Sequence, residues 1–263
     1  MSAMSHAVRD SRTMLRRNIR RMVRYPAGPA STVAVPLVVL FLFVTVFGDT
    51  MGAGLVGAAG GRGDYLEYVV PGILLLSVAG AAQGAAISVA MDMTEGIINR
   101  FRTMAISRGA ILAGHVLGNL LQTMAAIALI TVVAVVLGFR ANAVPVEWLA
   151  AAGLLAATSL AVIWLAVALG QVSGNVETAS NLPMPLILLP FLGSGFVPTD
   201  SMPTAVRWFA EYQPFTPIME TLRGLLLGTA IGADGLLAVA WILAIGVLGR
   251  LWAVRLFDRD PTA

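Results

Sequence analysis

Long apolar stretches without charge constrain the fold of this sequence more than any other feature. Val69–Met91 contains no charged residue in 23 positions, and Ala110–Phe139 contains none either. A helix of 23 residues is about 35 Å long, enough to cross the ~30 Å hydrocarbon core of a bilayer with some tilt. Only 12% of the 263 residues are charged, about half of the ~25% typical of soluble domains. The sequence therefore predicts an all-α polytopic membrane protein.

Six apolar segments are interpreted as transmembrane helices within one membrane domain, residues 30–263. They are predicted at Ala30–Phe47, Val69–Met91, within Ala110–Phe139, at Trp148–Gly170, between Glu177 and Asp200, and at Gly235–Val254. The fifth contains Pro183, Pro185 and Pro190, which predict kinks that neighbouring helices must satisfy. In the second, Gly80 and Gly84 predict a small-residue face for close helix packing.

Residues 1–29 precede the first span and have the pattern of an interfacial amphipathic helix. Apolar residues recur at helical spacing, and seven arginines supply the opposite, polar face. Such a helix lies on an anionic leaflet, and Pro26 and Pro29 would turn the chain into the bilayer. The alternative is a signal peptide. It is disfavoured because the charged region is long and no small-residue cleavage site follows promptly.

A charged island, Asp92–Gly109, separates the second and third spans. Thr94 is placed to cap a short helix, with Glu95 in its first turn near the positive helix end. The apolar residues that follow share one helix face, with arginines beside or beyond it: Ile97, Ile98, Phe101 and Met104 against Arg100, Arg102 and Arg108. A basic amphipathic helix of this kind suits docking onto another protein. The alternative is an ordinary loop made basic by membrane topology alone.

The distribution of arginine orients the six spans. With the N-terminus inside, the cytosolic segments hold 13 of the 17 arginines, seven in residues 1–29, three in 92–109, none in 171–181 and three in 250–263. The outer segments hold the other 4. Since positive residues concentrate on the cytosolic side, both termini and the island are expected in the cytoplasm of a bacterial cell, with the chain in its inner membrane.

The segment Asp200–Thr229 predicts two short helices, Pro203–Tyr212 and Pro217–Leu227, with Thr216 as a cap and Pro217 at the first helical position. The second helix is rich in leucine yet too short to span a bilayer. We therefore expect an outer helical hairpin, residues 200–229, that dips into the outer leaflet. Three of its charged residues are candidate site residues, and the last two are spaced to pair: Glu211, Glu220 and Arg223.

Several mechanisms are excluded by what the sequence lacks. Without cysteine there is no thiolate or disulfide chemistry, and without lysine there is no Walker A loop, so the chain is expected to bind no ATP itself. Clustered metal ligands are absent, and the centres of spans two to five carry no Asp, Glu, Lys or Arg for proton-coupled transport. The pI near 9.9 does not indicate nucleic acid, because the arginines cluster by membrane side.

An intramembrane serine hydrolase at Gly193-Ser194-Gly195 is also disfavoured. Its only candidate base in the membrane, His115, is predicted almost a bilayer away from Ser194, far beyond hydrogen-bond reach. His115 is interpreted instead as an interfacial or hydrogen-bonded histidine. The scattered polar residues of the spans are assigned to a substrate path: Gln83, Asn119 and Gln122. The chain is thus not expected to be an enzyme, and the force for any transport must come from a partner at the island.

The island resembles the segment after the second span in type-2 ABC exporter permeases, especially daunorubicin-resistance permeases. The matching residues are Glu95-Gly96-Ile97, Arg100-Phe101-Arg102 and Ile106-Ser107-Arg108. Further matches are Tyr68–Ile73 (YVVPGI) and Ser194–Pro198 (SGFVP) through Gln213–Pro217 (QPFTP). The resemblance covers essentially the whole chain. Ala105 departs from it, since a proline is expected there, and its absence would soften the end of the helix in the island.

The resemblance implies a permease dimer, with a second copy or a paralogue, carrying two ATP-binding subunits that hold ATP and Mg. It assigns a coupling helix to Glu95–Met104, with these contacts to the ATPase: Glu95, Gly96, Ile97, Arg100, Phe101 and Arg102. It implies export of hydrophobic or amphipathic drugs. Alternatives are export of a cell-envelope lipid or glycolipid and, from another class, an intramembrane enzyme or scaffold. A neighbouring gene for a cassette ATPase would separate transport from the last class.

Overall fold

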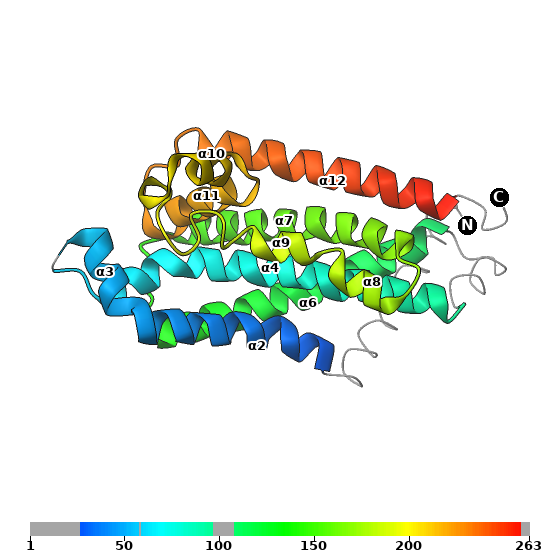
Figure 1. The fold of residues 1–263 in the computed structure, drawn as a ribbon, viewed down its shortest axis with the longest axis horizontal. Helices are drawn as coiled ribbons and strands as arrows, with labels where there is room; N and C mark the ends of the chain where they lie inside the picture. The colour runs from blue at the N-terminus through cyan, green and yellow to red at the C-terminus, as the bar shows by residue number, and fades with distance from the viewer. Residues whose placement is uncertain (1–26, 58, 97–107, 259–263) are drawn as a thin grey trace.

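A computed structural model describes residues 27–57, 59–96 and 108–258 of the chain, and all their regular elements are helical. They form an elongated bundle (Figure 1). In chain order the elements are α2 (Ala27–Leu42), the π-helical turn η1 (Phe43–Phe47), α3 (Gly48–Val56), α4 (Arg62–Thr94), α6 (Arg108–Val136), α7 (Pro145–Val172), α8 (Val176–Asn181), α9 (Met184–Leu188), the 3-10 turn η2 (Thr199–Ser201), α10 (Thr204–Tyr212), α11 (Phe215–Leu227) and α12 (Asp234–Asp258).

Five of these helical runs are long and apolar enough to cross a membrane: Thr32–Val56, Arg62–Thr94, Leu112–Val136, Pro145–Val172 and Asp234–Asp258. They correspond to predicted spans one, two, three, four and six. The bundle has two ends, which we call the hairpin end and the island end. The hairpin end holds α3, α10 and α11, and the island end holds the last turns of α4 and α12 and the first turn of α6 (Figure 1).

The first connection is shorter than predicted. The spans predicted at Ala30–Phe47 and Val69–Met91 leave residues 48–68 between them, but α3 continues the first span to Val56 and α4 already begins at Arg62. Gly52 and Gly60 allow this because their backbones touch, so that a Cβ at Gly60 would lie 2.2 Å from the Gly52 carbonyl oxygen. Arg62 also pairs with Asp49 at 3.2 Å across the turn. Helix formation is therefore favoured on both sides of a short turn.

Helix α4 lies at the centre of the bundle and packs against α2, α3, α6, α7, α8, α9 and α11. Most of its small and aliphatic residues are buried, and several are fully buried, among them Val69, Ile73, Ala79 and Ala86. Gly170 of α7 packs directly on it, since a Cβ there would lie 2.5 Å from the Ala86 carbonyl oxygen. The predicted packing at Gly80 and Gly84 is not found, because no atom of another described helix lies within 4 Å of a Cβ at either position.

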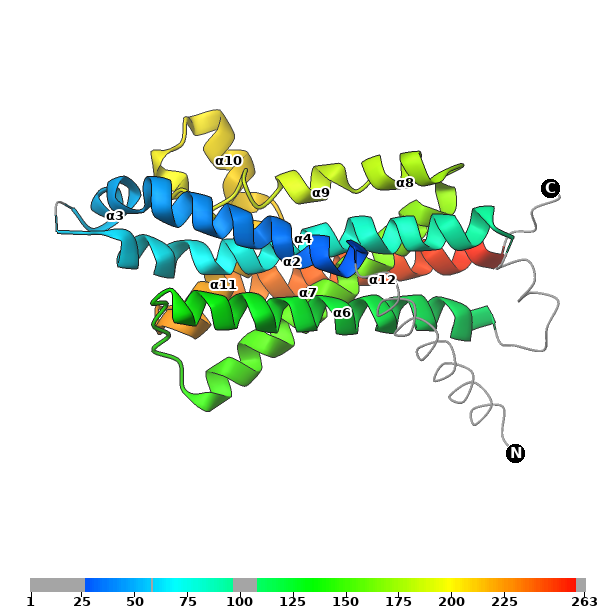
Figure 2. The same cartoon turned by 90° about the horizontal axis from the view of Figure 1, so that it is seen from below.

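The predicted fifth span is broken in the structure. Only α8 and α9 are helical between Gly174 and Pro198, and Pro183 and Pro190 lie at the breaks, where they supply no backbone N–H. The segment nevertheless follows α4 (Figure 2). Gln83 of α4 donates to the Ser180 carbonyl at 2.8 Å, and Tyr65 donates to the Phe196 carbonyl at 3.1 Å. Since Tyr65 and Gln83 are 18 residues apart on one helix, the broken segment runs along about 27 Å of α4.

The two short helices predicted in the hairpin are present as α10 and α11, but the second begins at a different residue from the one predicted. Helix α11 begins at Phe215, so Thr216 is not its cap. Instead, the side-chain oxygen of Gln213 accepts a hydrogen bond from the Phe215 N–H at 3.0 Å, which satisfies a donor of the first turn. Helix α11 is mostly buried against α4, α7 and α12, whereas α10 lies outside it with Trp208 and Tyr212 exposed.

Helix α10 supplies a matched test of this packing, because Ala205 is exposed and Ala210 on the same helix is fully buried. In the cysteine-free chain, we expect Ala205→Cys to react rapidly with a polar thiol reagent in detergent solution. Ala210→Cys should react far more slowly, since its labelling needs local opening of the hairpin. Mass spectrometry of labelled protein over time measures both rates. Equal rates would show that α10 is a solvated loop rather than a packed helix.

Candidate functional site

The described part of the charged island is the end of α4. Thr94 is the last residue of that helix, and its hydroxyl donates to the carbonyl three residues earlier at 3.0 Å. The predicted role of Thr94 as the cap of a new helix is therefore wrong. Glu95 is exposed, and Gly96 has φ +68°, a left-handed conformation that favours glycine at a helix end. The other predicted coupling residues lie outside the described residues, and their role stays a prediction: Ile97, Arg100, Phe101 and Arg102.

A buried polar pair joins the two helices that flank the island. Oδ2 of Asp92 on α4 lies 3.2 Å from Nε2 of His115 on α6, and the two side chains are 2% and 9% exposed. The Ser88 hydroxyl lies 3.5 Å from the other ring nitrogen. Since an anion at the carboxyl end of a helix opposes the helix dipole, a donor on the neighbouring helix stabilises Asp92 there. The pair fixes the end of α4 to the start of α6 and confirms that His115 is hydrogen-bonded.

The three predicted substrate-path residues make separate contacts. Gln83 bonds the broken segment, as described above, and Asn119 donates to the His115 carbonyl of its own helix at 2.8 Å. Gln122 of α6 donates to the Thr32 hydroxyl of α2 at 3.3 Å. Each side chain thus stabilises the bundle without converging on a common cavity. Their role in a substrate path stays a prediction.

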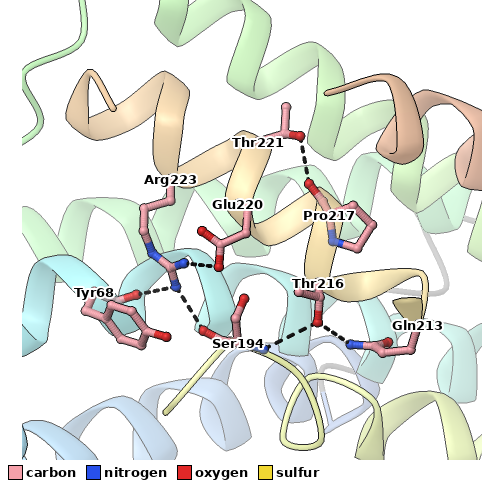
Figure 3. A network of polar contacts seen from close by, with 8 residues as sticks. All are labelled: Tyr68, Ser194, Gln213, Thr216, Pro217, Glu220, Thr221 and Arg223. Carbon is pink, nitrogen blue, oxygen red and sulfur yellow. Dashed lines mark hydrogen bonds and ion pairs between the residues drawn. The ribbon is translucent and has the colours of Figure 1, made fainter. Parts of the chain in front are cut away.

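At the hairpin end, Arg223 of α11 makes the most extensive side-chain contacts. It is 8% exposed and pairs with Glu220, as the spacing of three residues predicted. One terminal nitrogen also donates to the carbonyls of Tyr68, at 3.2 Å, and Ser194, at 2.9 Å (Figure 3). The guanidinium carbon lies 4.0 Å from the centre of the Tyr68 ring, a cation–π contact. Arg223 therefore ties α11 to both α4 and the broken segment.

A second set of bonds joins the same three elements. The Thr216 hydroxyl accepts from the side-chain amide of Gln213 at 2.9 Å and from the backbone N–H of Ser194 at 3.4 Å (Figure 3). Gly72 of α4 and Gly195 are in backbone contact, since a Cβ at Gly72 would lie 2.5 Å from the Gly195 carbonyl oxygen. We call this region the hairpin knot, defined by Tyr68, Gly72, Ser194, Gly195, Gln213, Thr216, Glu220 and Arg223.

The third charged residue predicted in the hairpin is not part of the knot. Glu211 accepts from Arg207 of the same helix, α10, at 2.6 Å, and Arg207 also pairs with Asp200 at 2.6 Å. The hydrogen bond to Glu211 and the charge of Asp200 raise the pKa of Arg207 above its ordinary value. These three charges lie on the solvent-accessible surface of the hairpin.

The structure also separates the residues of the hydrolase hypothesis. Ser194 contacts α4 through Arg223 near Tyr68, whereas His115 contacts α4 at Ser88. Those two positions on α4 are 20 residues apart, or about 30 Å along the helix axis. A proton cannot pass directly between Ser194 and His115 over that distance. This arrangement does not support hydrolase chemistry at Ser194.

Sequence reasoning missed two features of these sites. It assigned Asp92 to the cytosolic island because that residue follows an apolar run, although an acid at the end of a helix needs a partner and His115 was available. It also treated Tyr68–Ile73, Ser194–Pro198 and Gln213–Pro217 as separate stretches. In the structure all three meet in the hairpin knot, and only long-range contacts could place them together.

Comparison with known proteins finds relatives along most of the chain. Residues 9–227 match the family model described as ABC-2 type transporter. The chain is 28% identical over 230 residues to a daunorubicin resistance ABC transporter permease protein of Streptomyces coeruleorubidus, covering 87% of this chain and 78% of that protein. It is 22% identical over 241 residues to a probable doxorubicin resistance ABC transporter permease protein of Mycobacterium tuberculosis, covering 90% and 85%.

The hairpin knot predicts a strong effect of Arg223→Met on stability. Methionine fills much of the same space but leaves the carbonyls of Tyr68 and Ser194 and the charge of Glu220 without this partner. We expect a loss of about 3 kcal/mol, near the lower end for a broken buried ion pair because Glu220 is partly exposed. Thermal denaturation of the purified protein measures the decrease in stability as a lower melting temperature. The control Arg207→Met removes an arginine whose side chain is 43% exposed, and should change stability little. Equal shifts would contradict the assignment.

Proposed function

Because the chain belongs to the ABC-2 type transporter family, we propose that it is the transmembrane permease subunit of an ATP-driven exporter of hydrophobic or amphipathic drugs. The observation that carries this proposal is its similarity, over most of both chains, to a permease named for daunorubicin resistance. The relative in Mycobacterium tuberculosis, named for doxorubicin resistance, supports the same class of cargo. An apolar bundle open to lipid suits substrates that enter from a membrane.

ATP and Mg bind in this proposal to a separate subunit, since a chain without lysine cannot form a Walker A loop. Two copies of that subunit dock onto a dimer of permeases, made of this chain and a second copy or a paralogue. The docking element is the island, with Glu95 and Gly96 at its start and Phe101 as the residue that enters a groove of the ATPase. The Asp92–His115 contact supports this role, because it braces the two helices from which the island extends.

The broken segment, residues 176–198, supplies the crossing that the five long helices leave missing, and it is the fifth of six in chain order. Its support is the contact along about 27 Å of α4, from Ser180 beside Gln83 to Phe196 beside Tyr65. Broken helices are tolerated at membrane depth where protein buries them. With six crossings, both termini lie on the same side, which the arginine distribution assigns to the cytoplasm of a bacterial cell.

Helix α4 is the element that connects ATP hydrolysis to export in this mechanism. Its 33 residues extend about 50 Å, and Asp92 near the island end is 27 residues, or about 40 Å, from Tyr65 at the hairpin end. A shift of α4 driven at the island would therefore act on the hairpin knot. Breaking contacts of the knot, such as those of Arg223, would then open a path outward between α4, α11 and the broken segment.

The proposed orientation predicts the location of reporters fused to the chain. A reporter after Gly109 should be cytosolic, and one inserted at Gly57, in the turn between α3 and α4, should be external. A pair of reporters, one active only in the cytoplasm and one only outside it, measures each site independently. Reversed signals at either position would contradict the six-span orientation.

The coupling role predicts the effect of Phe101→Ala. Loss of an aromatic anchor from a partner's groove commonly costs at least ~2 kcal/mol, or about thirtyfold in affinity. We expect the variant to enter the membrane normally but to lose the ATPase subunit or its drug-stimulated ATP hydrolysis. The matched control is Phe41→Ala, since Phe41 is an exposed phenylalanine of α2 far from the island.

The measurement uses the complex copurified with its ATPase, and reads subunit stoichiometry and ATP hydrolysis with a panel of drugs and lipids. Drug stimulation of the wild-type complex supports drug export, and stimulation by a cell-envelope lipid alone would contradict it. A folded Phe101→Ala complex with wild-type stoichiometry and stimulation would remove the coupling role. An unstable variant would show that Phe101 packs within its own chain.

A further inference from the structure

Helices α7 and α12 run side by side in the same direction and touch along a line of small residues. A Cβ at Gly249 of α12 would lie 2.7 Å from the backbone nitrogen of Leu165, so the two backbones are in contact there. Closer to the island end, the side-chain amide of Gln171 donates to the Ala253 carbonyl at 3.1 Å. These contacts hold the two helices together over several turns.

An apolar groove of about 450 Å³ lies beside this line of contact. Its walls include Leu165 from α7 and Ile245, Leu248 and Trp252 from α12. Leu248 is 66% exposed and Trp252 40% exposed, so the groove is accessible from the surface of the bundle. The volume falls within the ~300–1,000 Å³ typical of sites for small organic ligands.

One end of the groove is positively charged. Among the described residues that line it, Arg255 alone is charged, and Arg250 lies on the same helix, with its guanidinium carbon 5.9 Å from the centre of the Trp164 ring. Both arginines are exposed, and within the described residues neither has an acidic side chain in ion-pair distance. Arg250 precedes the end of α12 by eight residues, about 12 Å along the axis. A cation that far inside a spanning helix is costly without a counter-charge.

We propose that this groove binds a phospholipid with an anionic headgroup. The headgroup pairs with Arg255 and Arg250, and an acyl chain lies along Leu165, Ile245 and Leu248. Trp252, whose ring has an apolar body and one polar N–H, lies where the chain meets the headgroup. The arginines decide the class of ligand: they repel a cationic drug, and a neutral one gains little from them. A phospholipid matches both the charge and the apolar walls.

The lipid is a structural ligand that packs against both α7 and α12, and it is not the transported cargo. In the proposed orientation the arginine end of α12 faces the cytosolic leaflet, whose surface carries anionic lipid. That assignment of leaflet rests on the proposed orientation, but binding itself does not rest on export. It is measured on the purified chain alone, without the ATPase or a drug, so its failure is distinct from failure of the transport function.

Native mass spectrometry of the full chain in detergent tests the site, with phosphatidylglycerol and phosphatidylcholine as probes. We expect the wild type to retain phosphatidylglycerol preferentially, and Arg250→Gln/Arg255→Gln to retain it about tenfold less. The control Arg140→Gln removes an exposed arginine at the opposite end of the bundle and should bind as the wild type does. Leu248→Trp keeps both charges but fills the groove, and should weaken retention of the anionic lipid.

Three outcomes would overturn the proposal. One is equal retention of the two lipids by the wild type, and another is undiminished retention by the double variant. The third is displacement of phosphatidylglycerol by daunorubicin, which would identify the groove as part of the drug path. Thermal denaturation provides a second readout. Phosphatidylglycerol should stabilise the wild type and Arg140→Gln but not the double variant, and equal stabilisation of all three would count against the site.

Discussion

The contact between Gly72 and Gly195 sets how closely the broken segment approaches α4, and the hairpin knot depends on that approach. A Cβ at Gly72 would lie 2.5 Å from the Gly195 carbonyl oxygen, a separation that real side chains do not show. At this separation Tyr65 reaches the Phe196 carbonyl, and Arg223 reaches the carbonyls of Tyr68 and Ser194 together. Irregular backbone in an apolar bundle needs such donors, since the surrounding lipid supplies none.

The two ends of α4 are held by charged and aromatic polar residues, and its middle is held mainly by packing. Asp92 meets His115 at one end, and Tyr65 and Tyr68 join the hairpin region at the other. Between Tyr68 and Ser88, the described side-chain hydrogen bonds from α4 to other elements are those of Ser77, to the Thr32 carbonyl at 3.3 Å, and Gln83, to the Ser180 carbonyl at 2.8 Å. Dispersion contacts change gradually with a small axial shift, whereas hydrogen bonds are exchanged or lost. In the proposed mechanism, a shift of α4 therefore breaks or exchanges contacts at its two ends, while its middle slides without losing its packing.

Composition and periodicity were sufficient for the class and for most of the helices. The uncharged runs placed α4, α6, α7 and α12, and the proline pattern placed α10 and α11. Errors arose where tertiary contacts override local signals. Thr216 is a residue type that often caps helices, yet α11 begins before it. The Gln213 side chain accepts from the Phe215 N–H, and the Thr216 hydroxyl accepts from the Ser194 N–H. Gly80 and Gly84 have the spacing of a packing motif, yet Gly72 and Gly170 make the close contacts. The residues adjacent to a side chain in the sequence do not determine which residue it contacts across the bundle.

The same reasoning separates two uses of arginine in this chain. Arg223 is buried with three acceptors and an aromatic ring from its own chain, so its charge is compensated by the fold. Arg250 and Arg255 are exposed on α12, without an acidic partner among the described side chains. Net positive charge near one membrane surface explains why arginines occur there, but it does not explain an apolar groove that ends at one of them. An exposed arginine beside an apolar groove, with no acidic partner among the described side chains, favours a ligand that carries both an anionic group and an acyl chain, as a phospholipid does.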